Sequence, residues 1–459
     1  MNPDDLKLIL LALASIGVLV VLVTWAKLNA FIALVIASLI VGSGAVLMGR
    51  ASGGSPYTML AVAKSIRDGL GATLGGIAAV LGLGAMLGKL LAESGGAEVL
   101  AKRFAAFFGP KHIQWCMIAL ALAVGLTTWF AVGLILLLPI LLTLTRETKQ
   151  PFLMLVLPLL SCLSVMHGLM PPHPGPVVAV EMLKANMGLV LFWGFIVGIP
   201  TAMVAGPLYA KWAVKNVEAH PPEAAAPDKA DPTLRRPGFG LTLFSILLPV
   251  VLMLLSTLAE LLLPKGHPVR DAATFVGDPM IALMVSVIFA LWSLGASCGY
   301  NKGRLLKFSE TSVAAIGMTL LVVGGGGGFA RVLRDSGVAD AIGRFGESLH
   351  LSPLLYGWLI SAFIRVATGS ATVAITTASA LLVPVMALHP EFTPSHVALI
   401  IVSIGCGSLF LSHLNDAGFW IVKDCLGLTV AQTFKTWTVC ETIVGLIGLV
   451  FASLCFRFI

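Results

Sequence analysis

Hydrophobic residues fill long stretches of this chain, and few charged positions interrupt them. A helix that crosses a bilayer needs about 20 predominantly apolar residues, so the pattern predicts about 12 transmembrane helices. The stretches at 112–145 and 352–388 are too long for one crossing, so each is either broken or doubled. A β-barrel would show short alternating segments instead, and the chain is therefore predicted to be an all-α polytopic membrane protein. The stretches lie at about 6–25, 28–48, 71–92, 112–145, 150–170, 186–212, 240–263, 279–298, 311–333, 352–388, 394–412 and 433–456.

One polar segment interrupts this pattern near the middle of the chain. Residues 213–237 are rich in Pro, Ala and charged residues and cannot span a membrane. We interpret them as a water-exposed linker between a first transmembrane repeat half, 1–212, and a second, 238–459. Lys and Arg gather in this linker and in the loop at 299–310, whereas the loop between them is poorer in both. Because cytoplasmic loops are enriched in Lys and Arg, the linker is predicted to be cytoplasmic.

The composition agrees with a membrane location and excludes several classes of protein. Of the 459 residues, 11% are charged, against roughly 25% in soluble domains. The net charge of +7 does not indicate nucleic-acid binding, because basic cytoplasmic loops produce the same bias. The cysteines form no CxxC pair, and the sequence contains no HExxH motif. We therefore expect no metal, no cofactor and no enzyme active site.

Two segments 242 residues apart resemble each other. Residues 82–95 read GLGAMLGKLLAESG, and residues 324–337 read GGGGGFARVLRDSG. A duplicated membrane bundle is typical of many secondary transporters. Whether the two repeats are inverted depends on the number of crossings between them, which the sequence leaves open. The five glycines at 324–328 are interpreted as a close helix-packing surface, because no Gly-Lys-Ser/Thr follows them as in a phosphate-binding loop.

The same spacing aligns two expected interruptions in the long apolar stretches. Thr127 and Thr128 fall opposite Gly369 and Ser370. Small hydroxyl residues beside a glycine let a helix unwind at membrane depth, which is tolerated only where the freed backbone groups line a cavity or bind a ligand. Paired interruptions in both halves point to a substrate site. The residues expected there are Thr127, Thr128, Thr368, Gly369, Ser370 and Thr372.

Arg365 is a charged residue inside an apolar stretch. A central Arg costs about 2.5–3.5 kcal/mol even on the gentler insertion scales. One interpretation is that its side chain reaches the membrane interface or pairs with a buried carboxylate. The other is an anion receptor, because a guanidinium can bind a carboxylate through two parallel hydrogen bonds.

Two segments rich in helix breakers follow apolar stretches, one in each half. The first, 167–176, contains His167, His173 and four prolines, which exclude a regular helix. It is either a loop at the membrane surface or a re-entrant tip that reaches the substrate. Its counterpart, 412–420, contains His413, Asn415 and Asp416. Asp416 either carries a proton or contacts substrate, or it caps the following helix.

Together these segments resemble the gluconate permease family of bacterial proton symporters. The resemblance covers about residue 28 to the C-terminus and is weakest in the linker. It implies proton-driven uptake of sugar acids across the inner membrane, with some relatives carrying idonate, fructuronate or D-serine. It also implies kinship with a broader ion-transporter superfamily that has inverted repeats, broken helices and hairpin loops. The specific stretches are KHIQW (111–115), HGLMPPHPGP (167–176), LLPKGH (262–267), VGDPM (276–280), GGGGGF (324–329), DSGV (335–338), RVATGSATVA (365–374) and SHLNDAGFW (412–420).

One position departs from the pattern that this resemblance implies. An acidic residue is expected near the first interruption, where this chain has Ala131. If that carboxylate carries the coupled proton in relatives, the coupling here either falls to Asp416 or accompanies a different substrate.

The sequence thus predicts a multi-pass transporter in the bacterial inner membrane, not an enzyme. The first hypothesis for its function is proton-coupled uptake of a small hydroxylated carboxylate, with gluconate as the best single candidate. Alternatives are a carrier of another such carboxylate or of D-serine, and a gradient-independent facilitator. The expected partners are this substrate, protons and the lipid bilayer, with a homodimer by analogy alone. The expected substrate-binding residues are Arg365, Thr368, Gly369, Ser370, Thr372, Thr127, Thr128, His167, His173 and Asn415, and the expected proton-coupling residues are Asp416 and His413.

Overall fold

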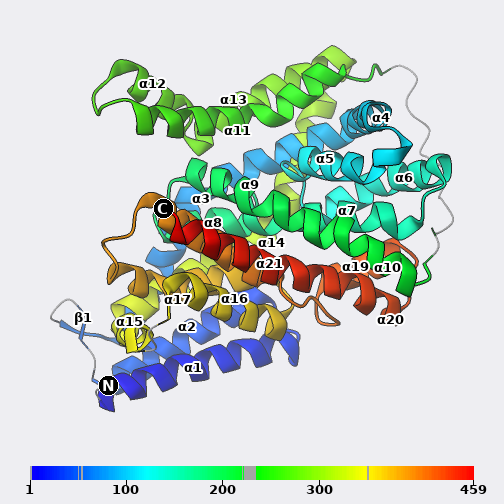
Figure 1. Cartoon of the computed structure of the whole chain (residues 1–459). Coiled ribbons are helices and arrows are strands. Elements are labelled where there is room, and N and C mark those ends of the chain that lie inside the picture. The colour runs from blue at the N-terminus through cyan, green and yellow to red at the C-terminus, as the bar shows by residue number, and fades with distance from the viewer. Residues whose placement is uncertain (1–2, 50, 53–54, 220, 222–233, 349–350) are drawn as a thin grey trace.

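The computed structural model describes residues 3–49, 51–52, 55–219, 221, 234–348 and 351–459. Nearly all the regular structure in these ranges is helical, as the apolar pattern predicts. The exception is an antiparallel pair of two-residue strands, β1 (Ala51–Ser52) and β2 (Ser55–Pro56). Figure 1 shows α1 and α2 on one side of the helical bundle and α11 to α13 on the opposite side.

The helices fall into two series on either side of the linker. The first series is α1 (Pro3–Thr24), α2 (Ala30–Leu47), α3 (Met59–Glu93), α4 (Gly96–Phe108), η1 (Pro110–His112), α5 (Ile113–Gly125), α6 (Phe130–Thr148), α7 (Phe152–Leu169), α8 (Pro174–Met182), α9 (Met187–Met203), η2 (Val204–Leu208) and α10 (Tyr209–Asn216). The second is α11 (Phe239–Leu262), α12 (Pro268–Val276), α13 (Pro279–Ala290), η3 (Leu291–Gly295), η4 (Ala296–Cys298), α14 (Lys302–Asp335), α15 (Val338–Ser348), α16 (Pro353–Thr368), α17 (Ala371–Ala387), α18 (Pro394–Leu409), α19 (Ala417–Cys425), α20 (Val430–Thr433), η5 (Phe434–Thr438) and α21 (Val439–Arg457). Most of the predicted linker lies outside the described residues.

Membrane-spanning helices are about as numerous as the sequence predicts. Within the described ranges, 10 helices are long and apolar enough to cross a membrane, or up to 11 if α4 and α5, bent by 105° at their junction, count as one span. The apolar helices α16, α17 and α18 are shorter, with 16, 17 and 16 residues. The sequence count of about 12 is slightly higher because it includes apolar stretches that fold into such shorter helices.

The two overlong stretches are doubled, because each folds into a helical hairpin. In the second half, a Cβ atom on Gly357 of α16 would lie 3.3 Å from Cδ2 of Leu382 of α17, so α17 runs back along α16. In the first half, Ile113 at the start of α5 and Leu144 near the end of α6 line the same cavity, so α6 also returns. The tips of these hairpins hold Thr127 and Thr128 in one half and Gly369 and Ser370 in the other.

The breaker-rich segments interrupt spans and do not form hairpin tips. Helices α7 and α8 form one span of 31 residues, Phe152–Met182. The break falls at Met170–His173, and every residue from 168 to 180 is buried. The interpretation of 167–176 as a surface loop is therefore wrong, and this segment forms a buried break within a span. The proline ring removes a backbone donor and so stops the helix at this depth.

Helix boundaries in the two halves correspond at the spacing of the sequence repeat. Helix α3 ends at Glu93 and α14 ends at Asp335, which is 242 residues later. The same spacing separates the first residues of α4 and α15, and those of α7 and α18. Each half therefore contains a long helix, a short helix, a hairpin and a broken span in the same order.

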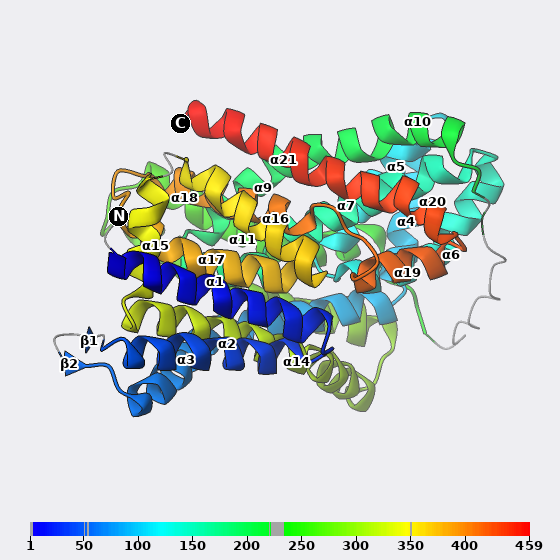
Figure 2. The same ribbon diagram turned by 90° about the horizontal axis from the view of Figure 1, so that it is seen from below.

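The equivalent helices α3 and α14 pack against each other in opposite directions. A Cβ on Gly328 would lie 3.0 Å from the carbonyl oxygen of Ile66, and one on Gly324 would lie 3.0 Å from Cγ of Leu70. Residues later in α3 thus contact residues earlier in α14, so the two helices are antiparallel. Because they are equivalent helices of the two repeats, the repeats are inverted relative to each other. Figure 2 shows these two helices with α2 along one side of the molecule.

The glycine run on α14 serves helix packing, as its sequence suggests. A Cβ on Gly327 would lie 2.1 Å from Oγ1 of Thr73, and one on Gly326 would lie 1.9 Å from Cγ2 of Thr376. Both distances are too short for any side chain larger than hydrogen. The glycines therefore let α3 and α17 approach α14 closely.

Candidate functional site

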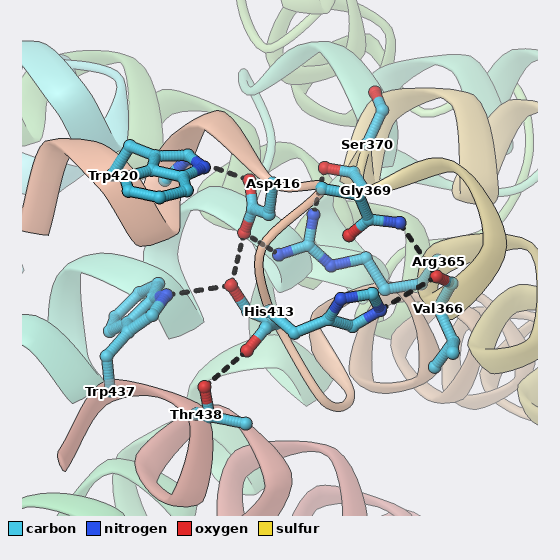
Figure 3. A network of polar contacts seen from close by, with 12 residues as sticks. Arg365, Val366, Gly369, Ser370, His413, Asp416, Trp420, Trp437 and Thr438 are labelled. Carbon is cyan, nitrogen blue, oxygen red and sulfur yellow. Dashed lines mark hydrogen bonds and ion pairs between the residues drawn. The ribbon is translucent and has the colours of Figure 1, made fainter. Parts of the chain in front are cut away.

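Arg365 on α16 is paired with Asp416, the N-cap residue of α19. Both side chains are buried, with 4% and 6% of their surfaces exposed. Nη2 of Arg365 donates to Oδ2 of Asp416, and Nη1 donates to the carbonyl oxygen of Gly369 at 2.6 Å (Figure 3). Of the two interpretations of Arg365, pairing with a buried carboxylate is therefore correct for this conformation. Nε of Arg365 has no hydrogen-bond partner among the described residues, so this one N–H of the guanidinium is free to donate.

Asp416 both binds Arg365 and caps a helix. Its Oδ1 accepts a hydrogen bond from the backbone N–H of Gly418 at 2.7 Å, in the first turn of α19. Its Oδ2 also accepts a hydrogen bond from Oγ of Ser412. The carboxylate thus accepts hydrogen bonds from three donors, and the one from the charged guanidinium is of the stronger kind.

The tip of the α16–α17 hairpin depends on Gly369. This residue has φ of +73°, a left-handed conformation that glycine adopts without steric cost. A Cβ there would lie 2.2 Å from the carbonyl oxygen of Asn415. Oγ of Ser370 caps α17 by accepting from the N–H of Val373 at 3.3 Å, whereas Thr368 donates to the carbonyl oxygen of Ile364 at 2.8 Å. The tip therefore packs directly on the break between α18 and α19.

Side chains of that break satisfy the carbonyl groups that the end of α16 leaves free. Nδ2 of Asn415 donates to the carbonyl oxygens of Val366, at 2.8 Å, and Ala367, at 3.1 Å. Nε2 of His413 lies 3.0 Å from the same oxygen of Val366 and donates to it (Figure 3). Helix ends buried in a membrane protein need such partners. Oδ1 of Asn415 is buried without a partner among the described residues, so it can accept one more hydrogen bond.

The first half repeats this arrangement with other residues. Nε2 of His173, in the break between α7 and α8, lies 3.2 Å from the carbonyl oxygen of Thr128 at the tip of the α5–α6 hairpin. Nδ1 of the same ring lies 3.0 Å from the carbonyl oxygen of Met170. The ring of His167 packs edge-on to that of His173 at 5.5 Å between centroids, and its Nδ1 has no partner in the described chain. In each half, a histidine of the broken span thus contacts the adjacent hairpin.

Thr127 and Thr128 are buried residues at the first tip that line a cavity. Both donate to the carbonyl oxygen of Val124, at 3.4 and 2.9 Å. These residues border a cavity of about 240 Å³ between α3, α14 and the tip. Its other polar lining residues are Lys89, Thr311 and Ser312.

Trp437 joins the two halves of the site. Its Nε1 donates to Oγ of Ser412 at 2.8 Å, and its ring lies 4.9 Å from that of Phe130 at the start of α6. Thr438 donates to the carbonyl oxygen of Ser412 at 2.6 Å (Figure 3). The first hairpin and the second broken span are therefore held against the same helix. The structure brings the expected residues into two linked groups. The first group is Thr127, Thr128, His167 and His173. The second is Arg365, Thr368, Gly369, Ser370, His413, Asn415 and Asp416, with Thr372 in the first turn of α17.

Glu441 is a buried acid that the sequence reasoning missed. Its side chain is 1% exposed, on α21. It forms a hydrogen bond with Ser164 of α7 and interacts electrostatically with both Arg365 and Asp416. The available signal was its position as the only acidic residue in the apolar stretch at 433–456. Within the described ranges, no group of three or more His, Cys, Asp or Glu side chains could hold a metal ion.

The fold resembles solved transporters whose sequences are distant. The YdaH transporter of Alcanivorax borkumensis superposes with a TM-score of 0.63 at 15% identity, over 93% of this chain and 98% of that one. MtrF of Neisseria gonorrhoeae superposes with a TM-score of 0.62 at 12% identity, over 92% and 94% of the two chains. At these identities the likeness concerns the fold alone.

Sequence relatives cover almost the whole chain. A gluconate permease of Zymomonas mobilis is 42% identical over 98% of both chains. The high-affinity gluconate transporter of Escherichia coli is 39% identical over 96% of this chain and 98% of its own, and the D-serine transporter DsdX of the same organism is 32% identical over 95% of both. The pattern of the GntP family of permeases matches residues 6–458. The chain is thus a multi-pass integral membrane transporter, not an enzyme, and it belongs to the GntP permease family.

Proposed function

We propose that this protein takes up a sugar acid, with gluconate as the best candidate, across the bacterial inner membrane in symport with protons. The observation that carries the proposal is the buried ion pair of Arg365 and Asp416 between a hairpin tip and a broken span. Relatives named gluconate permeases, which are 35–42% identical to this chain, support the substrate class. A fixed cation at this depth suits a monovalent organic anion.

In this proposal, Arg365 binds the carboxylate of the substrate. The Nε–H of Arg365 has no partner among the described residues, and its Nη2 loses its partner when the ion pair with Asp416 breaks. These two N–H groups then form the two-donor edge that a carboxylate prefers. The hydroxyl groups of the sugar acid would meet polar groups at the two tips and breaks. Those groups belong to Thr127, Thr128, His167, His173, Thr368, Ser370, Thr372 and Asn415, with Gly369 giving access to the tip.

Asp416 couples binding to protons because it competes with the substrate for one guanidinium. While Asp416 is ionised, Arg365 is held by it; protonation removes the charge that holds the pair together. His413, which fixes the neighbouring end of α16, lies in the same break and would move with it. A proton on Asp416 thus prepares Arg365 for the substrate.

The arrangement of the chain in the membrane is part of the proposal. The halves 1–212 and 238–459 would form the two inverted repeats, joined by a cytoplasmic linker at 213–237. The broken spans and hairpins of both halves would meet at the bilayer midplane, as in other transporters with inverted repeats. A homodimer is the expected assembly by analogy alone.

Purified protein in liposomes tests the substrate class. Liposomes loaded with unlabelled gluconate should exchange it for external labelled gluconate, and unlabelled competitors should rank the substrates. Idonate and D-serine belong in the panel because transporters of these compounds are 38% and 32% identical to this chain. If D-serine exchanges and no sugar acid does, the substrate class is wrong; if no compound exchanges, the proposed function is wrong.

A further inference from the structure

Glu441 is a carboxylic acid in an environment that offers its ionised form little support. It lies on α21 within the membrane span Val430–Arg457, with 1% of its surface exposed. Its Oε1 has no hydrogen-bond partner among the described residues. A buried polar atom without a partner is costly, and a buried charge without one is costlier still.

The two acids near Arg365 differ in what stabilises them. Asp416 accepts hydrogen bonds from Arg365, Ser412 and the backbone of Gly418. Glu441 has a hydrogen bond with Ser164 and interacts with Arg365 only at longer range, since no direct ion pair joins them. One guanidinium therefore neutralises Asp416, and Glu441 has no cation of its own among the described residues.

Among the described residues, Arg365 is the one basic group that interacts with Glu441. Apart from Arg365, the titratable side chains that face this region from the described elements around α21 are one carboxylic acid, one histidine and two thiols. They are Asp416 in the α18–α19 break, His167 on α7, Cys406 on α18 and Cys440 on α21 itself. The two cysteines are weak acids, and His167 carries no ion pair.

A bound substrate would bring a third carboxylate to this single guanidinium. With Asp416 and Glu441 both ionised, two negative charges would be left without a partner in a dry region, which like-charge repulsion and desolvation both oppose. Protonation of Asp416 removes one of these charges, and protonation of Glu441 removes the other. The loaded site is then neutral, with the substrate carboxylate balancing Arg365.

We propose that Glu441 is a second proton-binding residue of the transport site and must hold a proton before a substrate carboxylate can occupy Arg365. This inference rests on the proposed function. The proton binds a carboxylate oxygen of Glu441 on the uptake side and leaves it after the substrate has gone on the release side. No other bond forms or breaks.

Substitution with glutamine separates proton coupling from substrate binding. The Glu441→Gln side chain has nearly the same shape but is permanently neutral, so it should accept substrate at any pH. In liposomes at equal pH on both sides, we expect exchange of labelled for unlabelled gluconate within about threefold of the wild type. With an inward proton gradient, accumulation should fall at least tenfold. Glu391→Gln is the matched control, because the side chain of Glu391 is 61% exposed outside the site, and it should accumulate gluconate normally.

Three other outcomes would contradict either the inference about Glu441 or the proposed function. If Glu441→Gln accumulates gluconate like the wild type, the inference is wrong while the proposed function stands. If a folded Glu441→Gln protein loses exchange as well as accumulation, Glu441 acts in binding and the inference is again wrong. If the wild type exchanges no sugar acid, the proposed function itself fails. A second measurement compares the two proteins in weakly buffered detergent solution. The wild type should take up more protons per bound gluconate than Glu441→Gln, and equal proton uptake by the two proteins would overturn the inference.

Discussion

Arg365 of the α16–α17 hairpin and Asp416 of the α18–α19 break form a buried ion pair that joins two separate elements of the second repeat. The pair has two consequences. It satisfies a charge that would otherwise be isolated at membrane depth. In the function that we propose, Asp416 would also compete with the carboxylate of the substrate for the same guanidinium, so the contact that stabilises the empty protein is the one that substrate would replace.

Replacing Arg365 should weaken substrate binding. Hydrogen bonds to a charged group contribute about 1.5–3 kcal/mol, so Arg365→Ala should raise the half-saturating gluconate concentration about 10- to 150-fold. Arg365→Lys keeps the charge but not the two-donor edge and should give an intermediate value. Exchange kinetics in liposomes measure this, with Arg457→Ala, at an exposed position near the chain end, as the control. Arg365→Ala with unchanged affinity would remove Arg365 from the binding site.

Removing only one member of the ion pair should destabilise the protein. Asp416→Asn keeps a capping side chain for α19 but leaves the guanidinium of Arg365 buried without an anion, which costs about 3–5 kcal/mol. We expect a lower melting temperature in detergent. In the double variant Arg365→Met/Asp416→Asn no charge is left unpaired, so it should regain at least half of the lost stability, although not transport. Additive losses in the double variant would show that the pair is not coupled.

Gly369 should be intolerant of a side chain for two separable reasons. Its φ is +73° and a Cβ would meet the carbonyl oxygen of Asn415 at 2.2 Å, whereas Gly266 has φ of +85° and nothing within 4 Å of its Cβ position. Gly266→Ala should therefore show only the backbone strain, about 1–2 kcal/mol. Gly369→Ala should show that strain together with displacement of the break, and should lose transport. Equal effects of the two substitutions on transport would contradict the close packing of tip and break.

On α14, substitution of glycine by alanine should lower stability where the helix packs closely and have little effect where it does not. A Cβ on Gly327 would collide with Thr73, while a Cβ on Gly317 of the same helix meets nothing within 4 Å. Gly327→Ala should lower the melting temperature, because overpacking costs about 1–3 kcal/mol, and Gly317→Ala should leave it unchanged or raise it. Melting curves of the two variants in detergent decide this, and a destabilised Gly317→Ala with a normal Gly327→Ala would invalidate the α3–α14 packing.

Much of this fold follows from local pattern. Apolar stretches of bilayer length predict the spans, and the repeat at 82–95 and 324–337 predicts the two equivalent halves. The positions of the hairpin tips follow from glycine and hydroxyl residues in stretches too long for one crossing. The direction of the repeats could not be predicted, because it depends on whether each long stretch crosses once or returns.

The partners within the site could not be predicted from local pattern. Arg365 and Asp416 were each recognisable as polar residues in apolar surroundings, but their pairing is a tertiary contact across 51 residues of sequence. The same holds for His173 and Thr128, 45 residues apart. Glu441 was overlooked because one acidic residue near a span end is ordinary in sequence, and only the fold places it beside Arg365 and Asp416.

The most direct test of proton-driven sugar-acid transport is uptake of labelled gluconate by the purified wild-type protein in liposomes, with and without an inward proton gradient. We expect the gradient to drive gluconate inside the liposomes above its external concentration, and a protonophore to collapse the accumulation. Arg365→Ala should show neither effect at the same gluconate concentration. Uptake that never exceeds equilibration under any gradient would identify a facilitator and rule out proton-driven symport.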